Sequence, residues 1–207
     1  YEAASFFPDL EFMDFGSGFK VAYKDNDIVT DIEKIGAKIA ASFQEFCAQY
    51  GRELELWFEP GKYIVSEAGN LLVQANVVKQ TTSTVFVGVN SGQNHLIRPM
   101  FYNAYHHIEN VSNPDGEKKL YSVVGYICES DTLGFDRLMG EVREGDVLKI
   151  SNAGAYAFSM SNQYNSRFRP AEVLIYNSES FLIRKRETME DLIRNQVEIE
   201  ILEPELA

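Results

Sequence analysis

The sequence predicts two structural units, the end of an α/β domain followed by an all-β domain. Two observations support this division. Residues 10–58 give strand, glycine-loop, helix and strand signals in turn, which is the order of a βαβ unit with parallel strands. After about Gly69 the chain carries short segments rich in Val, Ile, Phe and Tyr, separated by turn residues.

The strands of the α/β unit are predicted at Leu10–Phe15 and Leu54–Phe58. The first alternates apolar residues with acids and runs into Gly16-Ser17-Gly18, and the second ends at Glu59-Pro60-Gly61. Ligand sites in parallel α/β folds lie at the carboxyl ends of strands, so both ends are candidate sites.

A helix is predicted over residues 31–50, because apolar residues recur there at three- and four-residue spacing. These residues are Ile32, Ile35, Ile39, Phe43, Phe46 and Cys47. Thr30 or Asp31 can cap the start of the helix, and Gly51 suits its C-terminal stop. One βαβ unit cannot bury its own core, and the chain begins at Tyr1, so we expect it to be a piece of a longer protein.

The second unit is predicted to be a β-barrel or sandwich. Its expected strands are Leu71–Gln80, Thr84–Val89, Leu120–Ile127, Val147–Ile150, Ala171–Tyr176 and Phe181–Lys185. A short helix is predicted over Thr188–Asn195, and the acidic segment Glu198–Glu205 is expected to be a solvated end.

The composition excludes several classes of protein. A net charge of −12 argues against nucleic-acid binding, which needs clustered Lys and Arg. No apolar run reaches the roughly 18 residues of a membrane span. The only cysteines, Cys47 and Cys128, form neither a disulfide framework nor a metal motif, which is typical of a cytoplasmic protein. The three histidines show no zinc-site spacing.

Cys128 and Glu129 follow the apolar run Val123–Ile127 and precede Ser130 and Asp131. A thiol can donate a proton and a carboxylate can bind an ammonium group, so the pair could recognise and protonate an amine substrate. Taken alone, a buried structural Cys is the commoner case.

Glu59-Pro60-Gly61-Lys62 offers a carboxylate, a glycine backbone N–H and a cation at a strand end. The carboxylate could pair with a protonated ring nitrogen and the other two groups with phosphate. A capped turn with a solvated Lys is an equally good interpretation from the residues alone.

Arg98 and Tyr102 would share one face of a helical turn, where Arg could bind a carboxylate in a two-pronged manner. Tyr156 follows Gly154 and could approach a ligand. The alternatives are that Arg98 is an ordinary surface residue and that Tyr102 and Tyr156 are core residues.

In order and rough spacing, these segments together resemble the diaminopimelate decarboxylases, pyridoxal-phosphate enzymes of the alanine-racemase fold type. The resemblance rests on the segments around Glu59, Arg98, Cys128 and Tyr156, together with Gly145-Asp146. It implies the last βα units of a (β/α)8 barrel at residues 1–68 and a C-terminal β domain at residues 69–207. It also implies a homodimer with shared active sites that converts meso-diaminopimelate to L-lysine and carbon dioxide in lysine biosynthesis.

The resemblance also implies roles for individual residues at the cofactor. Gly18 and Gly61 would contact the phosphate of pyridoxal phosphate, and Glu59 its pyridine nitrogen. Lys62 and Tyr156 would face both the cofactor and the substrate.

Four further residues would act on the substrate. Arg98 and Tyr102 would hold its distal carboxylate. Cys128 and Glu129 would enter the partner subunit's site, Cys128 as proton donor and Glu129 as the ligand of the distal ammonium group.

The chain departs from the family pattern at two positions and lacks two further residues. Lys62 stands where Arg is usual, and Ser17 interrupts the glycine-rich loop. The Schiff-base Lys and the His that stacks on the cofactor have no match here, so we expect these 207 residues alone to be inactive. A related decarboxylase of ornithine, arginine or carboxynorspermidine is the alternative, although such substrates have no use for Arg98. A non-enzymatic binding module is a third hypothesis.

Overall fold

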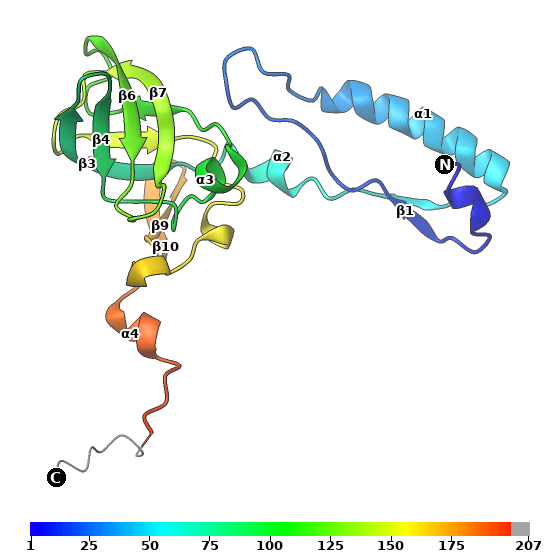
Figure 1. Ribbon diagram of the computed structural model, residues 1–207. Coiled ribbons are helices and arrows are strands. Elements are labelled where there is room, and N and C mark those ends of the chain that lie inside the picture. The colour runs from blue at the N-terminus through cyan, green and yellow to red at the C-terminus, as the bar shows by residue number, and fades with distance from the viewer. Residues whose placement is uncertain (200–207) are drawn as a thin grey trace.

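The computed structural model describes residues 1–199. Figure 1 shows two units at opposite ends of the molecule, the α/β unit and the β domain, with the short helix α2 (Gly61–Val65) between them. The C-terminal segment with α4 (Met189–Ile193) extends away from the β domain. Within residues 1–199, no helix is long and apolar enough to cross a membrane.

The α/β unit confirms the predicted βαβ order. Strands β1 (Phe12–Asp14) and β2 (Glu55–Trp57) pair in parallel, and α1 (Ile32–Tyr50) connects them. The Asp31 carboxylate accepts the Lys34 N–H at 3.0 Å, which identifies Asp31 as the cap. Gly51 ends the helix in the left-handed region at φ 79°.

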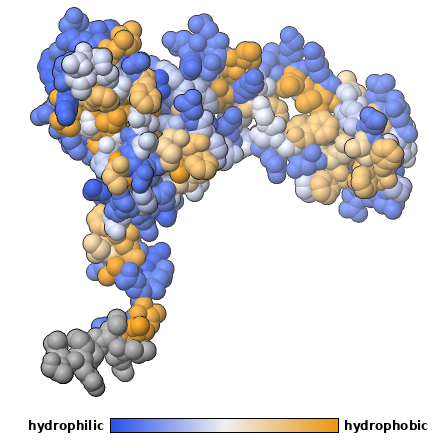
Figure 2. All heavy atoms as spheres, in the orientation of Figure 1, coloured by the Kyte–Doolittle hydropathy of each residue, from blue (hydrophilic) through white to orange (hydrophobic). Residues whose placement is uncertain are grey.

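Only part of the predicted apolar face of α1 is covered. Phe43 and Phe46 are buried against β1 and β2, but Ile32 is 43% exposed and Ile35 39% exposed. A 19-residue helix is about 28 Å long, whereas a three-residue strand spans about 10 Å. Two such strands cannot cover the whole helix, and Figure 2 shows apolar residues at the surface of this unit.

The β domain is a six-stranded mixed sheet that is nearly closed. Its strands are β3 (Leu71–Gln80), β4 (Val85–Val89), β5 (Ile108–Asn110), β6 (Lys118–Val124), β7 (Thr132–Gly140) and β8 (Val147–Ile150). They lie in the order β5-β8-β3-β4-β6-β7, and the outer strands β5 and β7 approach each other. Only β4 and β6 pair in parallel among these strands. The fold class predicted from the sequence is confirmed.

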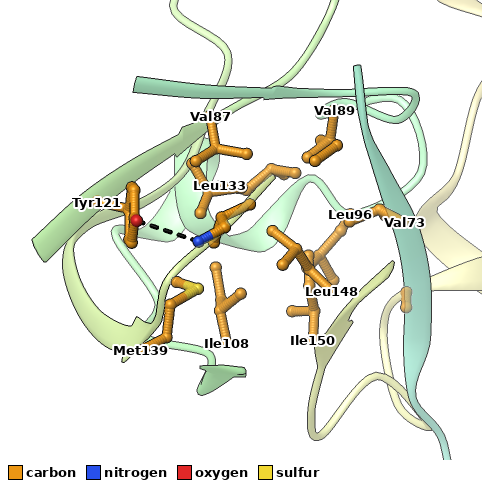
Figure 3. Close-up of a cluster of buried hydrophobic side chains, with 14 residues drawn as sticks. Val73, Val87, Val89, Leu96, Ile108, Tyr121, Leu133, Met139, Leu148 and Ile150 are labelled. Atoms are coloured by element: carbon orange, nitrogen blue, oxygen red, sulfur yellow. Dashed lines mark hydrogen bonds between the residues drawn. The ribbon is translucent and has the colours of Figure 1, made fainter. Parts of the chain in front are cut away.

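Side chains from all six strands fill the interior of this barrel (Figure 3). Branched aliphatic residues dominate, and Val87, Val123, Leu148 and Ile150 have no exposed surface. The one aromatic hydroxyl drawn in this core is satisfied, because Tyr121 Oη accepts the N–H of Val142 at 3.0 Å.

Of the remaining elements, η1 (Ala4–Phe6) belongs to the α/β unit, where Ala4 is buried with Phe43 and Phe46. The others flank the barrel, and they are α3 (Arg98–Tyr102), η2 (Phe158–Met160), η3 (Tyr164–Ser166) and the hairpin of β9 (Glu172–Tyr176) and β10 (Glu179–Arg184). Helix α4 begins at a capping box formed by Thr188 and Asp191, within the predicted range. Of the predicted acidic tail, residues 200–205 lie outside the described residues.

Two features of the sheet differ from the sequence prediction. The strand expected at Leu120–Ile127 starts at Lys118 and ends at Val124, because Gly125 and Ile127 donate their N–H groups to Asp131 instead of to a neighbouring strand. Strands β5 and β7 were not predicted. β5 has only three residues, and Gly134 and charged residues interrupt the pattern of β7.

Candidate active site

The carboxyl ends of β1 and β2 meet at the first part of the site. The Glu59 N–H donates to the Gly16 carbonyl at 2.7 Å, which joins the end of β2 to the glycine loop after β1. The Asp14 carboxylate accepts the Gly16 N–H at 2.7 Å and closes the turn. A Cβ atom added at Gly16 would lie 3.9 Å from Glu59 Oε2. The predicted carboxylate and the glycine loop are therefore neighbours.

The space beside Gly18 and Gly61 is open. Gly18 has φ 111°, which favours glycine, and a Cβ atom there would meet nothing within 4 Å. At Gly61, the first residue of α2, an added Cβ atom would also meet nothing within 4 Å, and the backbone angle φ does not require glycine. The Gly61 N–H donates to the Glu59 carbonyl at 2.9 Å, so the turn itself uses this group and the prediction that it is available to a phosphate is not supported in this structure. Only the open space beside Gly61 is available to a ligand.

Tyr156 is brought to α2 by close backbone contact. The N–H of Gly154 donates to the Ser66 carbonyl at 3.0 Å, and Ala153 donates to Gly69 at 2.8 Å. A Cβ atom on Gly154 would lie 1.7 Å from the Val65 carbonyl oxygen, so only glycine permits this approach. Tyr156 follows with φ 57° and is 50% exposed, so its ring is not a core residue.

Arg98 is held by two aromatic side chains at the start of α3. Its Nη1 donates to Tyr23 Oη at 3.0 Å and lies 3.1 Å from His106 Nε2. The guanidinium also lies 5.2 Å from the centre of the Tyr23 ring. Tyr102 is four residues along the same short helix and is 58% exposed. The predicted helical turn is confirmed, and the arginine in it has a defined orientation.

His106 is neutral in this arrangement. Burial lowers its pKa from 6.5 to about 4, and the positive charge of Arg98 acts in the same direction. Its Nδ1 lies 2.8 Å from the Ser151 carbonyl oxygen, which can only accept, so Nδ1 carries the proton. Nε2 is then free to accept the N–H of Arg98.

Cys128 and Glu129 lie in the loop between β6 and β7, and both are exposed. The buried Asp131 carboxylate organises this loop, accepting the N–H of Gln93 at 2.6 Å and that of Ile127 at 2.9 Å. Burial raises the pKa of Asp131. Gly125 has no room for a side chain, because a Cβ atom would lie 2.1 Å from Asp131 Oδ2.

Two neighbouring residues of η3 contact the thiol and the carboxylate. Asn165 Nδ2 donates to Cys128 Sγ at 3.5 Å, and Tyr164 Oη donates to Glu129 Oε1 at 3.2 Å. The contact with Glu129 raises the pKa of Tyr164.

An open groove of about 340 Å³ lies beside this pair. Its lining residues are Gln93, Met100, Glu129, Ser130 and Tyr164, so the groove adjoins both α3 and the Cys128 loop. A larger hollow of about 680 Å³ beside Cys47 contains none of the predicted site residues.

The structure thus arranges the predicted residues in separate groups. Glu59 lies with the glycine loop, Arg98 with α3, and Cys128 with Glu129. The sequence prediction gave no role to the side chains that orient them, which are Tyr23, His106, Asp131, Tyr164 and Asn165. Their contacts with the site span up to 75 residues of sequence, and no local spacing signals such contacts.

Family models match both units of the chain. The pyridoxal-binding domain of pyridoxal-dependent decarboxylases matches residues 2–66, and their C-terminal sheet domain matches residues 62–154. The open glycine loop with Glu59 fits such a cofactor, because it offers free space for a phosphate and a carboxylate for a ring nitrogen.

Curated relatives agree with these models. A diaminopimelate decarboxylase of Methanothermobacter thermautotrophicus is 44% identical over 91% of this chain and 44% of its own length. One of Neisseria meningitidis serogroup B is 41% identical over the same shares of the two chains. The chain therefore spans less than half the length of these relatives.

Solved structures share the fold. The diaminopimelate decarboxylase of M. jannaschii superposes with a TM-score of 0.85 at 36% identity, covering 92% of this chain and 44% of that one. A second structure of that enzyme was determined with L-lysine, and it has the same TM-score at 35% identity over 91% of this chain and 43% of that one. Both units, the one that carries the glycine loop and Glu59 and the one that carries Cys128, match this family, and the chain belongs to the pyridoxal-dependent decarboxylases.

Proposed function

We propose that the protein containing this chain decarboxylates meso-diaminopimelate to L-lysine with pyridoxal phosphate as cofactor. The observation that carries the proposal is that the chain presents two kinds of recognition group, an oriented guanidinium at Arg98 and an exposed thiol–carboxylate pair at Cys128 and Glu129. The names of the relatives support the same reaction. Diaminopimelate has a carboxylate and an ammonium group far from its reacting carbon, and the two recognition groups match them.

The cofactor is held by this chain at the ends of β1 and β2. Gly18, Gly61 and Lys62 bind its phosphate, and Glu59 keeps a proton on its ring nitrogen through charge pairing. When bound, pyridoxal phosphate supplies the electron sink that cleavage of the carbon–carboxylate bond requires. Tyr156, fixed by the Gly154 contact with α2, lines the cofactor and substrate.

The substrate is selected at its distal end. Arg98 and Tyr102 bind the distal carboxylate, Lys62 supplies a second cation, and Glu129 binds the distal ammonium group. A substrate without that carboxylate leaves Arg98 without its partner, which costs several kcal/mol, roughly, when the group is desolvated. Cys128 gives a proton to the reacting carbon once the carboxylate has left it.

We further propose that the enzyme is a cytoplasmic homodimer whose subunits exchange Cys128 and Glu129 into each other's sites. The exposure of both residues supports this arrangement, because a loop that completes a partner's site must be free in its own subunit. The two domains of this chain divide between residues 68 and 69.

A substrate panel tests the proposal in the full-length protein loaded with cofactor. Carbon dioxide release is measured with meso-diaminopimelate, lysine, ornithine, arginine and carboxynorspermidine. Preference for diaminopimelate is expected, together with its loss in Arg98→Gln. Arg143→Gln is the matched control, because Arg143 is exposed in the loop between β7 and β8 and is not in the site. Preference for ornithine or arginine, unaffected by Arg98→Gln, would identify the related decarboxylases instead.

A further inference from the structure

We infer that Tyr164 and Asn165 are positioning residues, Tyr164 for Glu129 and Asn165 for Cys128. One turn would then orient both the residue that recognises the substrate and the residue that donates the proton. The inference rests on the proposed function for its catalytic consequence. The contacts themselves are a matched pair. Adjacent donors at 164 and 165 reach adjacent acceptors at 129 and 128, at 3.2 and 3.5 Å.

The backbone of the turn at Tyr164–Ser166 has left-handed residues that help to place the two donors. Asn165 has φ 55° and ψ 31°, and Ser166 has φ 56°. Two consecutive left-handed residues are uncommon, and Asn tolerates this region better than most side chains. This conformation places the Tyr164 hydroxyl and the Asn165 amide against the same loop.

One buried segment anchors both the turn and the loop. The Gln93 N–H donates to the Asp131 carboxylate, which organises the Cys128 loop. The next residue, Asn94, accepts the N–H of Asn162 through its carbonyl at 2.9 Å, and Asn162 Oδ1 in turn accepts the N–H of Tyr164 at 3.0 Å. Asn94 has no exposed surface, so this segment lies in the interior of the domain. Two neighbouring residues between β4 and α3, Gln93 and Asn94, therefore hold the loop with Cys128 and Glu129 and the turn with Tyr164 and Asn165 in position relative to each other.

The chemistry of the two contacts differs. An amide N–H donated to sulfur stabilises the negative charge that grows on the thiol as it gives up its proton. A phenol donated to a carboxylate restricts that carboxylate to one orientation without neutralising it, so Glu129 can still bind an ammonium group. Asn165 is thus expected to affect the proton-transfer step, and Tyr164 to affect substrate binding.

Alkylation of Cys128 tests the role of Asn165 without any substrate. Full-length protein is treated with iodoacetamide at pH 8, and the Cys128 peptide is followed by mass spectrometry, with the half-buried Cys47 as an internal reference. Asn165→Asp should slow the reaction about tenfold, because a carboxylate beside the sulfur opposes its negative charge. Asn177→Asp is the matched control, a left-handed Asn at φ 50° in the β9–β10 turn, and should leave the rate unchanged.

Asn165→Gly keeps the left-handed backbone and removes the donor, so it serves as a second variant if the aspartate disturbs folding. Its alkylation should slow about threefold, the low end of what one hydrogen bond contributes. An unchanged Cys128 rate in both variants would overturn the inference, even if the protein decarboxylates diaminopimelate. Absence of decarboxylation with slowed alkylation would instead refute the proposed function alone.

Steady-state kinetics test the role of Tyr164. Tyr164→Phe should raise the KM for diaminopimelate about fivefold with little change in kcat, since a lost hydrogen bond loosens Glu129 but leaves Cys128 in place. Tyr176→Phe, on the exposed hairpin, is the control. An equal fall of kcat and kcat/KM in Tyr164→Phe would show that the hydroxyl acts in the transition state, and it would overturn the role assigned to Tyr164 in substrate binding.

Discussion

Acidification should destabilise this protein through His106, a residue held in one tautomer by two partners. Arg98 can only donate and the Ser151 carbonyl can only accept, so the ring must be neutral with its proton on Nδ1. His106 has no exposed surface. Protonation would place an imidazolium beside a guanidinium in a buried position, and both hydrogen-bond roles could not be kept.

The size of the effect follows from proton linkage. Burial lowers the pKa of His106 from 6.5 to about 4 in the folded protein. The native state then binds fewer protons than the unfolded state, so the stabilising contribution is present above pH 6.5 and is lost as the pH falls toward 4. These two values correspond to a loss of about 2 kcal/mol in the free energy of unfolding between pH 7 and pH 5.

Two measurements on the full-length protein check this reasoning. Between pH 7 and pH 5, urea unfolding should show that the wild type loses about 2 kcal/mol more than His106→Asn. The comparison isolates His106, because burial also lowers the pKa of His95 and that contribution is present in both proteins. His107→Asn, at the exposed neighbour, should behave as the wild type does. In ¹⁵N-histidine spectra, the His106 ring should stay neutral with its proton on Nδ1 from pH 8 to pH 5. A titration midpoint near 6.5 would refute the buried, Arg98-bound arrangement.

Three further substitutions have defined outcomes. Asp31→Ala removes the cap of α1 and should lower the free energy of unfolding by about 1 kcal/mol in urea titrations. Asp131→Asn leaves the backbone N–H of either Gln93 or Ile127 facing an amide donor instead of a carboxylate oxygen. This change should lower the free energy of unfolding by about 1–3 kcal/mol at pH 7. Gly154→Ala puts a methyl group on the Val65 carbonyl and should weaken pyridoxal-phosphate binding, measured by absorbance titration. Gly36→Ala, in open space on α1, should leave that affinity unchanged.

Local features of the sequence were sufficient for most of the fold. Strands β3 and β8 were predicted at their observed ends, and α1 was predicted to within one residue. Such elements are recognisable because their periodicity and caps depend on residues a few positions apart. β7 escaped prediction because its pairing with β6 outweighs a weak local pattern.

The sequence by itself therefore determined the two-unit fold, the order of most of its elements and the segments that resemble a decarboxylase. Only the tertiary structure decided how the site side chains are held. Tyr23 reaches Arg98 across 75 residues, and Asn165 reaches Cys128 across 37. The physical reason is that a hydrogen bond depends on where the folded backbone brings two groups together, and spacing along the chain carries no record of that distance.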